Sequence, residues 1–330
     1  QITSSEPADD IVFLKAYQNI QSLFFTLMAS EEFVDVFLID LDGNIIYAAN
    51  NRVALAVNLT DGPYQQSGLG FLYRELQEAP IGRTTVADLK PFNDELTMFI
   101  GTPIYQEGAQ VGILACQLNL AIINTIVQDR TGLGTTGETF LVGEFDEATS
   151  LRSDRLLKVG SIGDPKSGFD VEEALAGNSG TELKVGSTGI VEITAFAPLD
   201  VPGLKWGILT TISAEEAIAR QIDTDHEDEG LEELDLLGEH NADLGNYDLK
   251  MVTSDGLIFY SALHEADYQT NLLSGPYKDS HLAALFQQVL DTKQAAMSDF
   301  APYEASEGQP VVFTAAPMIH HGEVELVVVF

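Results

Sequence analysis

The chain has 330 residues, of which 45% are hydrophobic and 8% aromatic, and this is the composition of a folded protein with two or three domains. Its formal net charge of −35 argues against nucleic acid and anionic membranes as partners, because so negative a surface repels both. The single cysteine, Cys116, excludes a disulfide framework and a cysteine-based zinc site.

The first part of the chain predicts a helix followed by an antiparallel sheet. Apolar residues recur at helical spacing from Asp9 to Met28. After that, β-branched and aromatic runs alternate with turn signals such as Asp42-Gly43. The predicted elements are strands at 34–40 and 45–48, a helix at 67–78, and strands at 84–88, 96–105 and 110–118. Because hairpins or short crossovers join consecutive strands, the expected fold class is α+β.

A second unit follows with the same order of elements. The sequence predicts a helix at 120–129, a strand pair at 137–143 and 151–154, a helix at 171–177, and strands at 181–185, 189–197 and 204–212. Ser213 is the expected N-cap of a further helix, with Glu215 and Glu216 as a capping box. The acidic run 223–233 is interpreted as a solvated linker, since its likeness to a calcium-binding loop fails at Leu236.

A long internal repeat sets the architecture. The stretch Asn58–Leu69 returns 213 residues later as Asn271–Leu282, and both copies contain Gly-Pro-Tyr. Other positions pair at nearly the same offset: Asp35 with Asp248, Tyr47 with Tyr260, and Asp88-x-x-Pro-Phe92 with Asp299-x-x-Pro-Tyr303. The chain therefore contains two copies of one module with a different unit between them.

The residues between the two copies carry a family resemblance. The run Asp129-Arg-Thr-Gly-Leu-Gly-Thr-Thr-Gly-Glu-Thr-Phe-Leu-Val-Gly143, followed by Leu151-Arg-Ser-Asp154, is similar to the junction between the modules of double Cache (dCache) sensors. These are the extracytoplasmic ligand-binding regions of bacterial and archaeal receptors, and the resemblance covers most of residues 9–220. It implies tandem PAS-like Cache modules on a long N-terminal helix, with small ligands in the membrane-distal module and signals passing along helices.

The resemblance, the acidic run and the internal repeat together imply five regions along the chain. They are an N-terminal signalling helix (1–30), a distal module (31–118), a linker helix with a proximal module (119–220), an acidic linker (221–245) and a second distal-type module (246–330). The last module has no proximal partner, and Phe330 falls one residue before the repeat equivalent of Gln117. We therefore expect an incomplete double sensor, cut from a longer ectodomain.

Members of the family that bind amino acids hold them with an Arg, a Trp-Tyr pair, a further Tyr and an Asp, because the planar fork of Arg matches a carboxylate. This chain has Arg74 but no Arg-x-Trp-Tyr order, and Gln117 stands in place of the Asp, so a standard amino-acid ligand is not expected. The candidate ligand-binding residues are Tyr47, Tyr64, Arg74, Arg83, Asp88, Thr102 and Gln117 in the distal module, and Tyr260, Tyr277, Lys278 and Asp299 in the last module.

Two of these candidates have a structural alternative. Tyr64 belongs either to a turn whose ring packs on the sheet or to a pocket that uses its ring and hydroxyl. Asp88 either caps a loop or binds a polar ligand. His320 and His321 are interpreted as an exposed turn, because no third metal ligand lies at a suitable spacing.

The sequence contains no serine-hydrolase, zinc-protease or phosphate-binding motif, and we expect neither an enzyme nor a cofactor. The favoured function is an extracytoplasmic ligand-sensing domain of a transmembrane receptor (a histidine kinase, chemoreceptor or nucleotide cyclase) that binds a small polar molecule. The family resemblance implies weak homodimers through the N-terminal helix and anchoring through segments outside this chain. The alternatives are a structural or adhesive ectodomain with modules as spacers and, less favoured, an acidic hydrolase with paired carboxylates.

Overall fold

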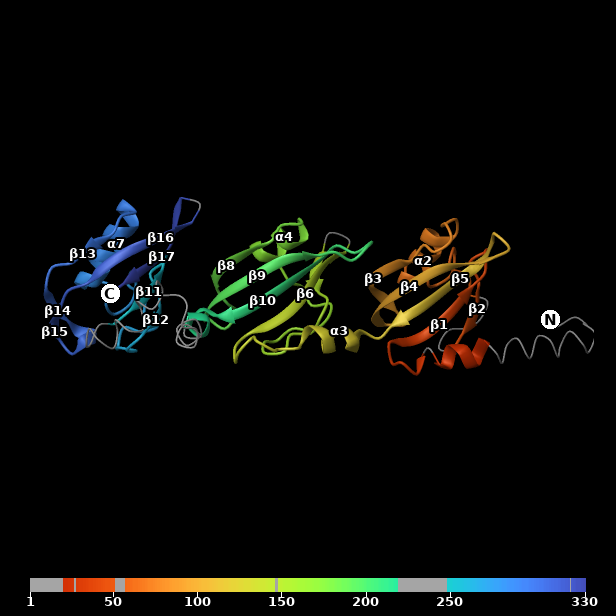
Figure 1. The fold of residues 1–330 in the computed structure, drawn as a ribbon, viewed down its shortest axis with the longest axis horizontal. Coiled ribbons are helices and arrows are strands. Elements are labelled where there is room, and N and C mark those ends of the chain that lie inside the picture. The colour runs from red at the N-terminus through yellow and green to blue at the C-terminus, as the bar shows by residue number, and fades with distance from the viewer. Residues whose placement is uncertain (1–19, 27, 51–56, 146–147, 219–247, 321) are drawn as a thin grey trace, which may run out of the picture. The chain divides into compact units, whose positions relative to one another are not determined.

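The computed structural model describes residues 20–26, 28–50, 57–145, 148–218, 248–320 and 322–330. The chain folds as two compact units. One contains residues 1–130, 138–180 and 195–210, and the other contains residues 131–137, 181–194 and 211–330. Three sheets with the same internal order follow one another along the sequence (Figure 1), and each defines a module.

The first module has the predicted α+β architecture. Its sheet has the order β2-β1-β5-β4-β3, and every neighbouring pair of strands is antiparallel. Figure 1 shows α2 lying across one face of this sheet, where it contacts β3 and β4. The elements are β1 (Phe33–Ile39), β2 (Ile45–Ala48), α2 (Gly68–Leu76), β3 (Thr85–Phe92), β4 (Glu95–Gln106) and β5 (Ala109–Leu118).

Local sequence explains where these elements begin and turn. The Asp40 carboxylate accepts hydrogen bonds from the backbone N–H groups of Asp42 and Asn44, and Gly43 supplies the positive φ of +87° that this tight hairpin requires. Ser67 is the N-cap of α2, where its hydroxyl accepts from the N–H of Gly70. Each predicted element of this module is therefore present within a few residues of its predicted ends.

The second module has the sheet order β7-β6-β10-β9-β8. The strand predicted at 151–154 is wrong in its position, because the observed strand ends at Leu151. The side chains of Ser153 and Asp154, which follow it, form hydrogen bonds with other segments of the module. The Ser153 hydroxyl accepts from the N–H of Leu141, and Asp154 accepts from Ile162. The elements are α3 (Leu120–Val127), β6 (Glu138–Phe145), β7 (Ala148–Leu151), α4 (Phe169–Leu175), β8 (Gly180–Val185), β9 (Val191–Leu199) and β10 (Trp206–Ser213).

The third module repeats the first in detail. Its sheet order is β12-β11-β17-β16-β13, and the β11–β12 hairpin has its bulge at the position equivalent to the bulge between β1 and β2. A small two-stranded sheet, β14–β15, carries the turn η1 and is separate from the main sheet, whereas the first module continues its β3–β4 pairing through the matching residues. The elements are β11 (Lys250–Thr253), β12 (Ile258–Ser261), α7 (His281–Thr292), β13 (Ala296–Met297), β14 (Ala301–Tyr303), η1 (Glu304–Ser306), β15 (Gln309–Val311), β16 (Thr314–His320) and β17 (Glu323–Val329).

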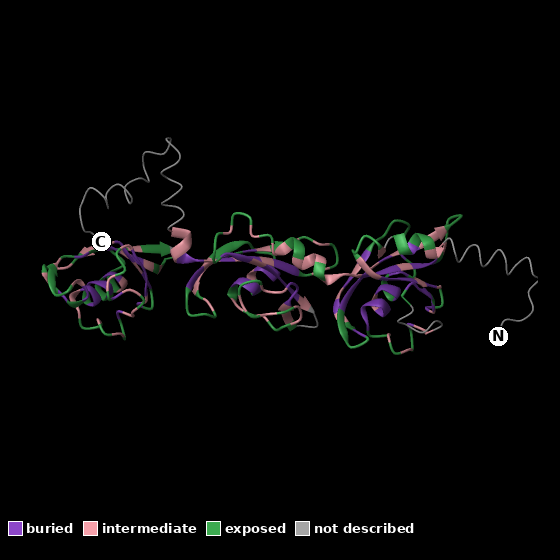
Figure 2. Ribbon diagram, turned by 90° about the horizontal axis from the view of Figure 1, so that it is seen from below, coloured by how far each residue is buried: buried purple, intermediate pink, exposed green. Residues whose placement is uncertain are grey.

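The core of each module lies between its sheet and its helix. Figure 2 shows buried residues along the strands and exposed residues in the turns of every module. The hydrophobic cores gather around Phe37 and Leu72 in the first module, Phe140 and Val171 in the second, and Phe286 and Val327 in the third. This pattern confirms the prediction of tandem PAS-like modules.

The predicted capping box at the end of the second module is wrong in one half. The Ser213 hydroxyl does accept from the N–H of Glu216 as an N-cap should. The Glu216 carboxylate, however, accepts from the N–H groups of Thr135 (2.6 Å) and Thr136 (2.7 Å) instead of reaching back to Ser213, whose own N–H donates to the Thr136 hydroxyl. The loop at Thr135 and Thr136, which is distant in sequence, has therefore replaced Ser213 as the partner of the Glu216 carboxylate.

Some predictions concern residues outside the described part of the chain. They are most of the helix at 9–28, of which residues 20–26 and 28 are described and helical, the acidic run 223–233, and His321. Within the described ranges, every helix is too short or too polar to span a membrane.

Candidate functional site

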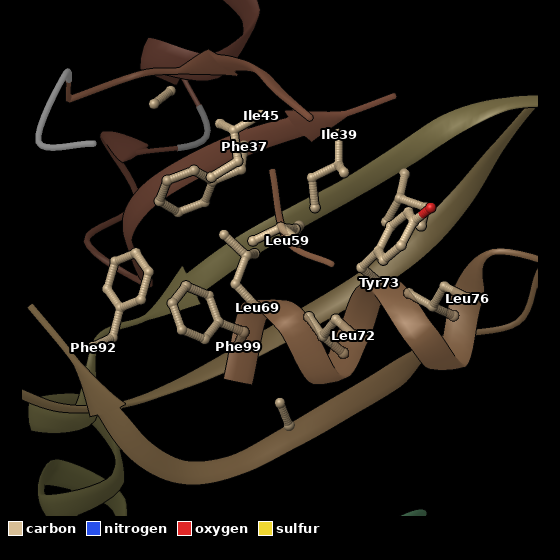
Figure 3. Close-up of a cluster of buried hydrophobic side chains, with 14 of the residues drawn as sticks. Phe37, Ile39, Ile45, Leu59, Leu69, Leu72, Tyr73, Leu76, Phe92 and Phe99 are labelled. Atoms are coloured by element: carbon tan, nitrogen blue, oxygen red, sulfur yellow. The ribbon is translucent and has the colours of Figure 1, made fainter. Parts of the chain in front are cut away.

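The interior of the first module is packed with aromatic and aliphatic side chains. Figure 3 shows Phe37, Phe92 and Phe99 pointing toward one another beside Leu69 and Leu72. The ring centroids of Phe37 lie 6.2 Å from Phe92 and 6.0 Å from Phe99, and those of Phe92 and Phe99 are 5.0 Å apart. These edge-to-face contacts fill the space between α2 and the sheet.

The predicted site residues of the first module do not gather around one space. Tyr47 packs against Phe24, on the face of the sheet opposite to Phe37. Gln117 is buried on strand β5, on the same face as the core residue Ala115. Three more of the seven lie at the surface or the edge of the module. Thr102 donates to the backbone carbonyl of the exposed Arg83, and the exposed Arg74 donates to the carbonyl of Gln65.

Tyr64 and its turn have a packing role. The Tyr64 ring lies 4.7 Å from the Phe92 ring, and its hydroxyl donates to the Asn93 side chain at 2.7 Å. Its repeat equivalent, Tyr277, lies 5.8 Å from the Tyr303 ring. Both tyrosines therefore close one end of their module's interior, and both remain half-buried.

Asp88 contacts the second module. Its carboxylate forms two parallel hydrogen bonds with the Arg152 guanidinium, at 3.0 and 3.1 Å, and accepts a third from the indole N–H of Trp206 at 3.2 Å. Arg152 is almost fully buried, and such paired geometry is the strong form of an ion pair. A Cβ on Gly143 would lie 2.7 Å from Arg152 Nε, so only glycine leaves room for this guanidinium. Asp88 thus joins β3 to the second module.

The third module replaces part of the aromatic interior with charge. At the offset that aligns the repeat, Lys250 stands where the first module has Phe37. Its ammonium is buried and lies 2.5 Å from Asp248, 2.8 Å from Asp267 and 3.0 Å from Glu265. Burial would lower the pKa of Lys250, but the hydrogen bonds and charges of Asp248 and Asp267 outweigh it and hold the pKa above its ordinary value.

Tyr303 completes this buried cluster and stands where the first module has Phe92. Its hydroxyl donates to Asp267 at 2.7 Å, and both side chains are almost fully buried. Burial and the adjacent carboxylate raise the pKa of Tyr303 far above its ordinary value, so the phenol stays protonated. We call Asp248, Lys250, Glu265, Asp267 and Tyr303 the buried cluster.

His281 brings another polar group into this interior. It stands where the first module has Gly68, at the start of the helix, and its ring lies 5.6 Å from Tyr303 and 5.0 Å from Phe313. Its Nε2 atom is buried and has no hydrogen-bond partner among the described residues. A buried imidazole nitrogen in this state costs free energy unless a water or a ligand reaches it.

An open cleft of about 730 Å³ adjoins the buried cluster, and Asp248 and Glu265 belong to both. The cleft is formed where the chain runs through β14, η1 and β15. Here the segment from Tyr303 to Phe313 is three residues longer than the matching segment of the first module, from Phe92 to Phe99. Its apolar wall includes Leu263, Phe300, Val311, Val312 and Phe313, and its remaining acidic lining comes from Glu304 and Glu307. A cleft of this size with mixed lining suits a small organic ligand.

The predicted residues of the third module lie around this region, outside the cleft lining. Tyr260 is buried on the sheet face that carries Leu249 and Phe259, away from the buried cluster. Lys278 is exposed, and Asp299 is exposed with its carboxylate accepting from the N–H of Phe300. Among the described residues, no group of His, Cys, Asp and Glu is arranged to hold a metal ion, and in the buried cluster the Lys250 ammonium occupies the centre of the carboxylates.

Sequence reasoning missed the buried cluster, although the repeat contains its signal. Aligning Val36-Phe37-Leu38 with Leu249-Lys250-Met251 places a lysine at a position that the first copy fills with a core aromatic residue. Substitution of charge into a core position is a departure from the strand pattern that points to a function. The pairing with Glu265 and Asp267 needs the fold, since the equivalent segment of the first copy shares no obvious identity with theirs.

No protein-family model matches the chain, and no curated protein matches it. Solved structures similar to it include the extracellular domain of a candidate histidine kinase, rpHK1S-Z16, at 15% identity over 64% of this chain and 86% of that chain, with a TM-score of 0.43. The ligand-binding domain of the Pseudomonas aeruginosa PAO1 amino acid chemoreceptor PctB, in complex with L-Gln, is similar at 19% identity over 69% and 84%, with a TM-score of 0.41. That of the Pseudomonas fluorescens chemoreceptor CtaA, in complex with L-leucine, is similar at 14% identity over 57% and 74%, with a TM-score of 0.37.

Proposed function

We propose that the chain is the extracytoplasmic ligand-sensing region of a transmembrane receptor, and that the ligand binds in the third module. We keep the predicted modules 31–118, 119–220 and 246–330, and we assign signalling and weak dimer contacts to the predicted N-terminal segment 1–30, most of which lies outside the described residues. The receptor's output is that of a histidine kinase, a chemoreceptor or a nucleotide cyclase, the classes that the sequence resembles.

One observation carries the choice of the third module. The first and third modules share strand order, hairpin register and aromatic packing, yet the third has Lys250 and Tyr303 in place of Phe37 and Phe92 and a cleft beside them. Burying an ammonium among carboxylates is at best neutral for stability compared with an apolar core. A polar interior beside a cleft is therefore better explained by ligand binding than by folding.

The first module has the opposite character, and this favours a supporting role for it. Its interior is filled by Phe37, Phe92 and Phe99, and Asp88 is engaged with Arg152 and Trp206. A spacer module is expected to have such a packed interior. The structural alternative thus applies to this module, while the third module keeps the sensing role.

The internal repeat supplies the control for an experiment on the whole chain. A library of small polar metabolites is screened by thermal shift, and each hit is mapped by hydrogen exchange with mass spectrometry. We expect hits to protect amides in 248–267 and 300–313 and to leave the matching segments 35–50 and 89–99 unchanged. Protection of the first module instead would contradict the assigned site, and a library without hits would favour the structural or adhesive function.

A further inference from the structure

The charge of the buried cluster is unbalanced. One ammonium, that of Lys250, faces three carboxylates, and in the described part of the chain these carboxylates form ion pairs with Lys250 alone. Asp267 and Lys250 are almost fully out of contact with solvent, and Asp248 is nearly so. An excess of negative charge in such surroundings is costly, because little water is present to screen it.

The excess charge opens onto the cleft through Glu265. This side chain is 23% exposed and lines the cleft, and it uses only Oε2 for Lys250. Its Oε1 has no hydrogen-bond partner among the described residues. A cationic group in the cleft would meet this oxygen, with Asp248 close by on the same lining, and would balance the charge of the buried cluster.

The rest of the lining strengthens the preference for a cation. Glu304 and Glu307 add carboxylates at the turn η1, and no lysine, arginine or histidine is among the described residues that line the cleft. A ligand carboxylate would therefore meet four acidic side chains and no cationic partner. Electrostatic repulsion from these side chains excludes binding of an anion and weakens binding of a zwitterion.

The apolar wall defines the other half of the ligand. Leu263, Phe300 and Val312 line the cleft and expose 50%, 67% and 42% of their surface. Large apolar side chains left exposed together along a cleft are typical of a ligand site, because a ligand's hydrocarbon part removes them from water. The ligand should thus combine a cation with an apolar body.

We propose that the cleft of the third module binds a primary amine: an ammonium group held by Glu265 and Asp248, on an apolar body that contacts Phe300 and Val312, without a carboxylate. This inference rests on the proposed function, which assigns the ligand to the third module, and it specifies the ligand's chemical class.

The test is calorimetric titration of the whole chain with three probes of similar size: 2-phenylethylamine, phenylalanine and 3-phenylpropionate. These carry the same ring with an ammonium, with both charges, and with a carboxylate. We expect the amine to bind, phenylalanine to bind at least about tenfold more weakly, and 3-phenylpropionate not to bind. Ethylamine, which has the ammonium without the ring, should bind much more weakly than 2-phenylethylamine.

Two variants with the same change in net charge separate a specific site from general attraction to an acidic surface. Glu265→Gln removes the carboxylate that faces the cleft and should weaken 2-phenylethylamine binding at least about tenfold. Asp279→Asn removes an exposed carboxylate of the same module that does not line the cleft, and it should leave binding unchanged. Equal effects of both variants would overturn the proposal, because they would show non-specific attraction.

The outcomes also distinguish this inference from the proposed function. If phenylalanine or 3-phenylpropionate binds as tightly as the amine, the proposed amine class is overturned. If the same compound also protects the backbone amides of 248–267 from hydrogen exchange, the site in the third module is upheld. Absence of binding by every amine at millimolar concentration would overturn the amine class too. In that case the metabolite screen, with its own mapping, would still decide whether the third module binds a ligand.

Discussion

At the scale of single residues, Lys250 holds three carboxylates together in the interior of the third module. We expect Lys250→Met to reduce the free energy of opening of this module by about 3–5 kcal/mol, since removing one partner leaves buried charges without compensation. Hydrogen exchange of amides in β11 and β12 measures this free energy. Lys278→Met, at an exposed lysine of the same module, should change it by less than about 0.5 kcal/mol. An equal effect of the two substitutions would contradict the role of Lys250.

The same residue shows how far sequence could predict the site. The repeat alignment indicates that Lys250 replaces a core aromatic residue, and strand alternation indicates that it points inward. The partners Glu265 and Asp267 lie 15 and 17 residues away along an irregular connection, and no periodic pattern brings them to Lys250. In the same way, Asp88 meets Arg152 and Trp206 across 64 and 118 residues. Contacts of this kind depend on tertiary structure, so the spacing of residues in the sequence predicts neither the partners of Lys250 nor those of Asp88.

At the scale of elements, Glu216 connects the start of a helix to the glycine-rich loop that carries the family resemblance. Desolvation opposes ionisation of Glu216, but hydrogen bonds from the Thr136 side chain and from the N–H groups of Thr135 and Thr136 outweigh it. They lower its pKa from an ordinary value near 4.5 to about 2. Because the folded pKa is the lower one, the stabilisation is fully present above about pH 4.5 and is lost as pH falls toward 2.

This linkage predicts a pH-dependent difference between two proteins. Glu216→Gln should lower Tm relative to the unmodified chain by a constant amount from pH 7 down to about pH 4.5, and the difference should shrink as pH falls below that. Differential scanning calorimetry of both proteins between pH 3 and pH 7 measures it. Glu215→Gln serves as the neighbouring control, since Glu215 accepts from Tyr268 and not from the loop. A difference that grows on acidification would contradict the contact.

At the scale of the whole molecule, the repeat predicted the architecture well, and the three shared sheet orders explain why. Turn residues such as Gly43 and Gly256, and helix caps such as Ser67 and Ser280, recur at equivalent places and fix the path of the chain locally. The second module has the same order without obvious sequence identity, so its topology was predicted from the order of its elements. The repeat did not predict that the third module buries charged side chains in an interior that the first module, with the same strand order, fills with aromatic residues.

The net charge of −35 gives a prediction for the molecule as a whole. Repulsion among so many carboxylates destabilises a compact state, and salt screens it as the Debye length falls from about 10 Å at 0.1 M to about 3 Å at 1 M. We expect Tm to rise between 0.05 and 1 M NaCl by an amount equivalent to about 1 kcal/mol or more, roughly 2–4 °C for a unit of this size. Sucrose at matched osmolality is the control for solvent effects unrelated to charge. The buried cluster should contribute little to this rise, because Lys250 and Asp267 are almost fully buried and salt screens buried pairs much less than surface charges, so Lys250→Met should show a similar salt dependence. A Tm that is flat or falls with NaCl would mean that surface repulsion does not limit the stability of this fold.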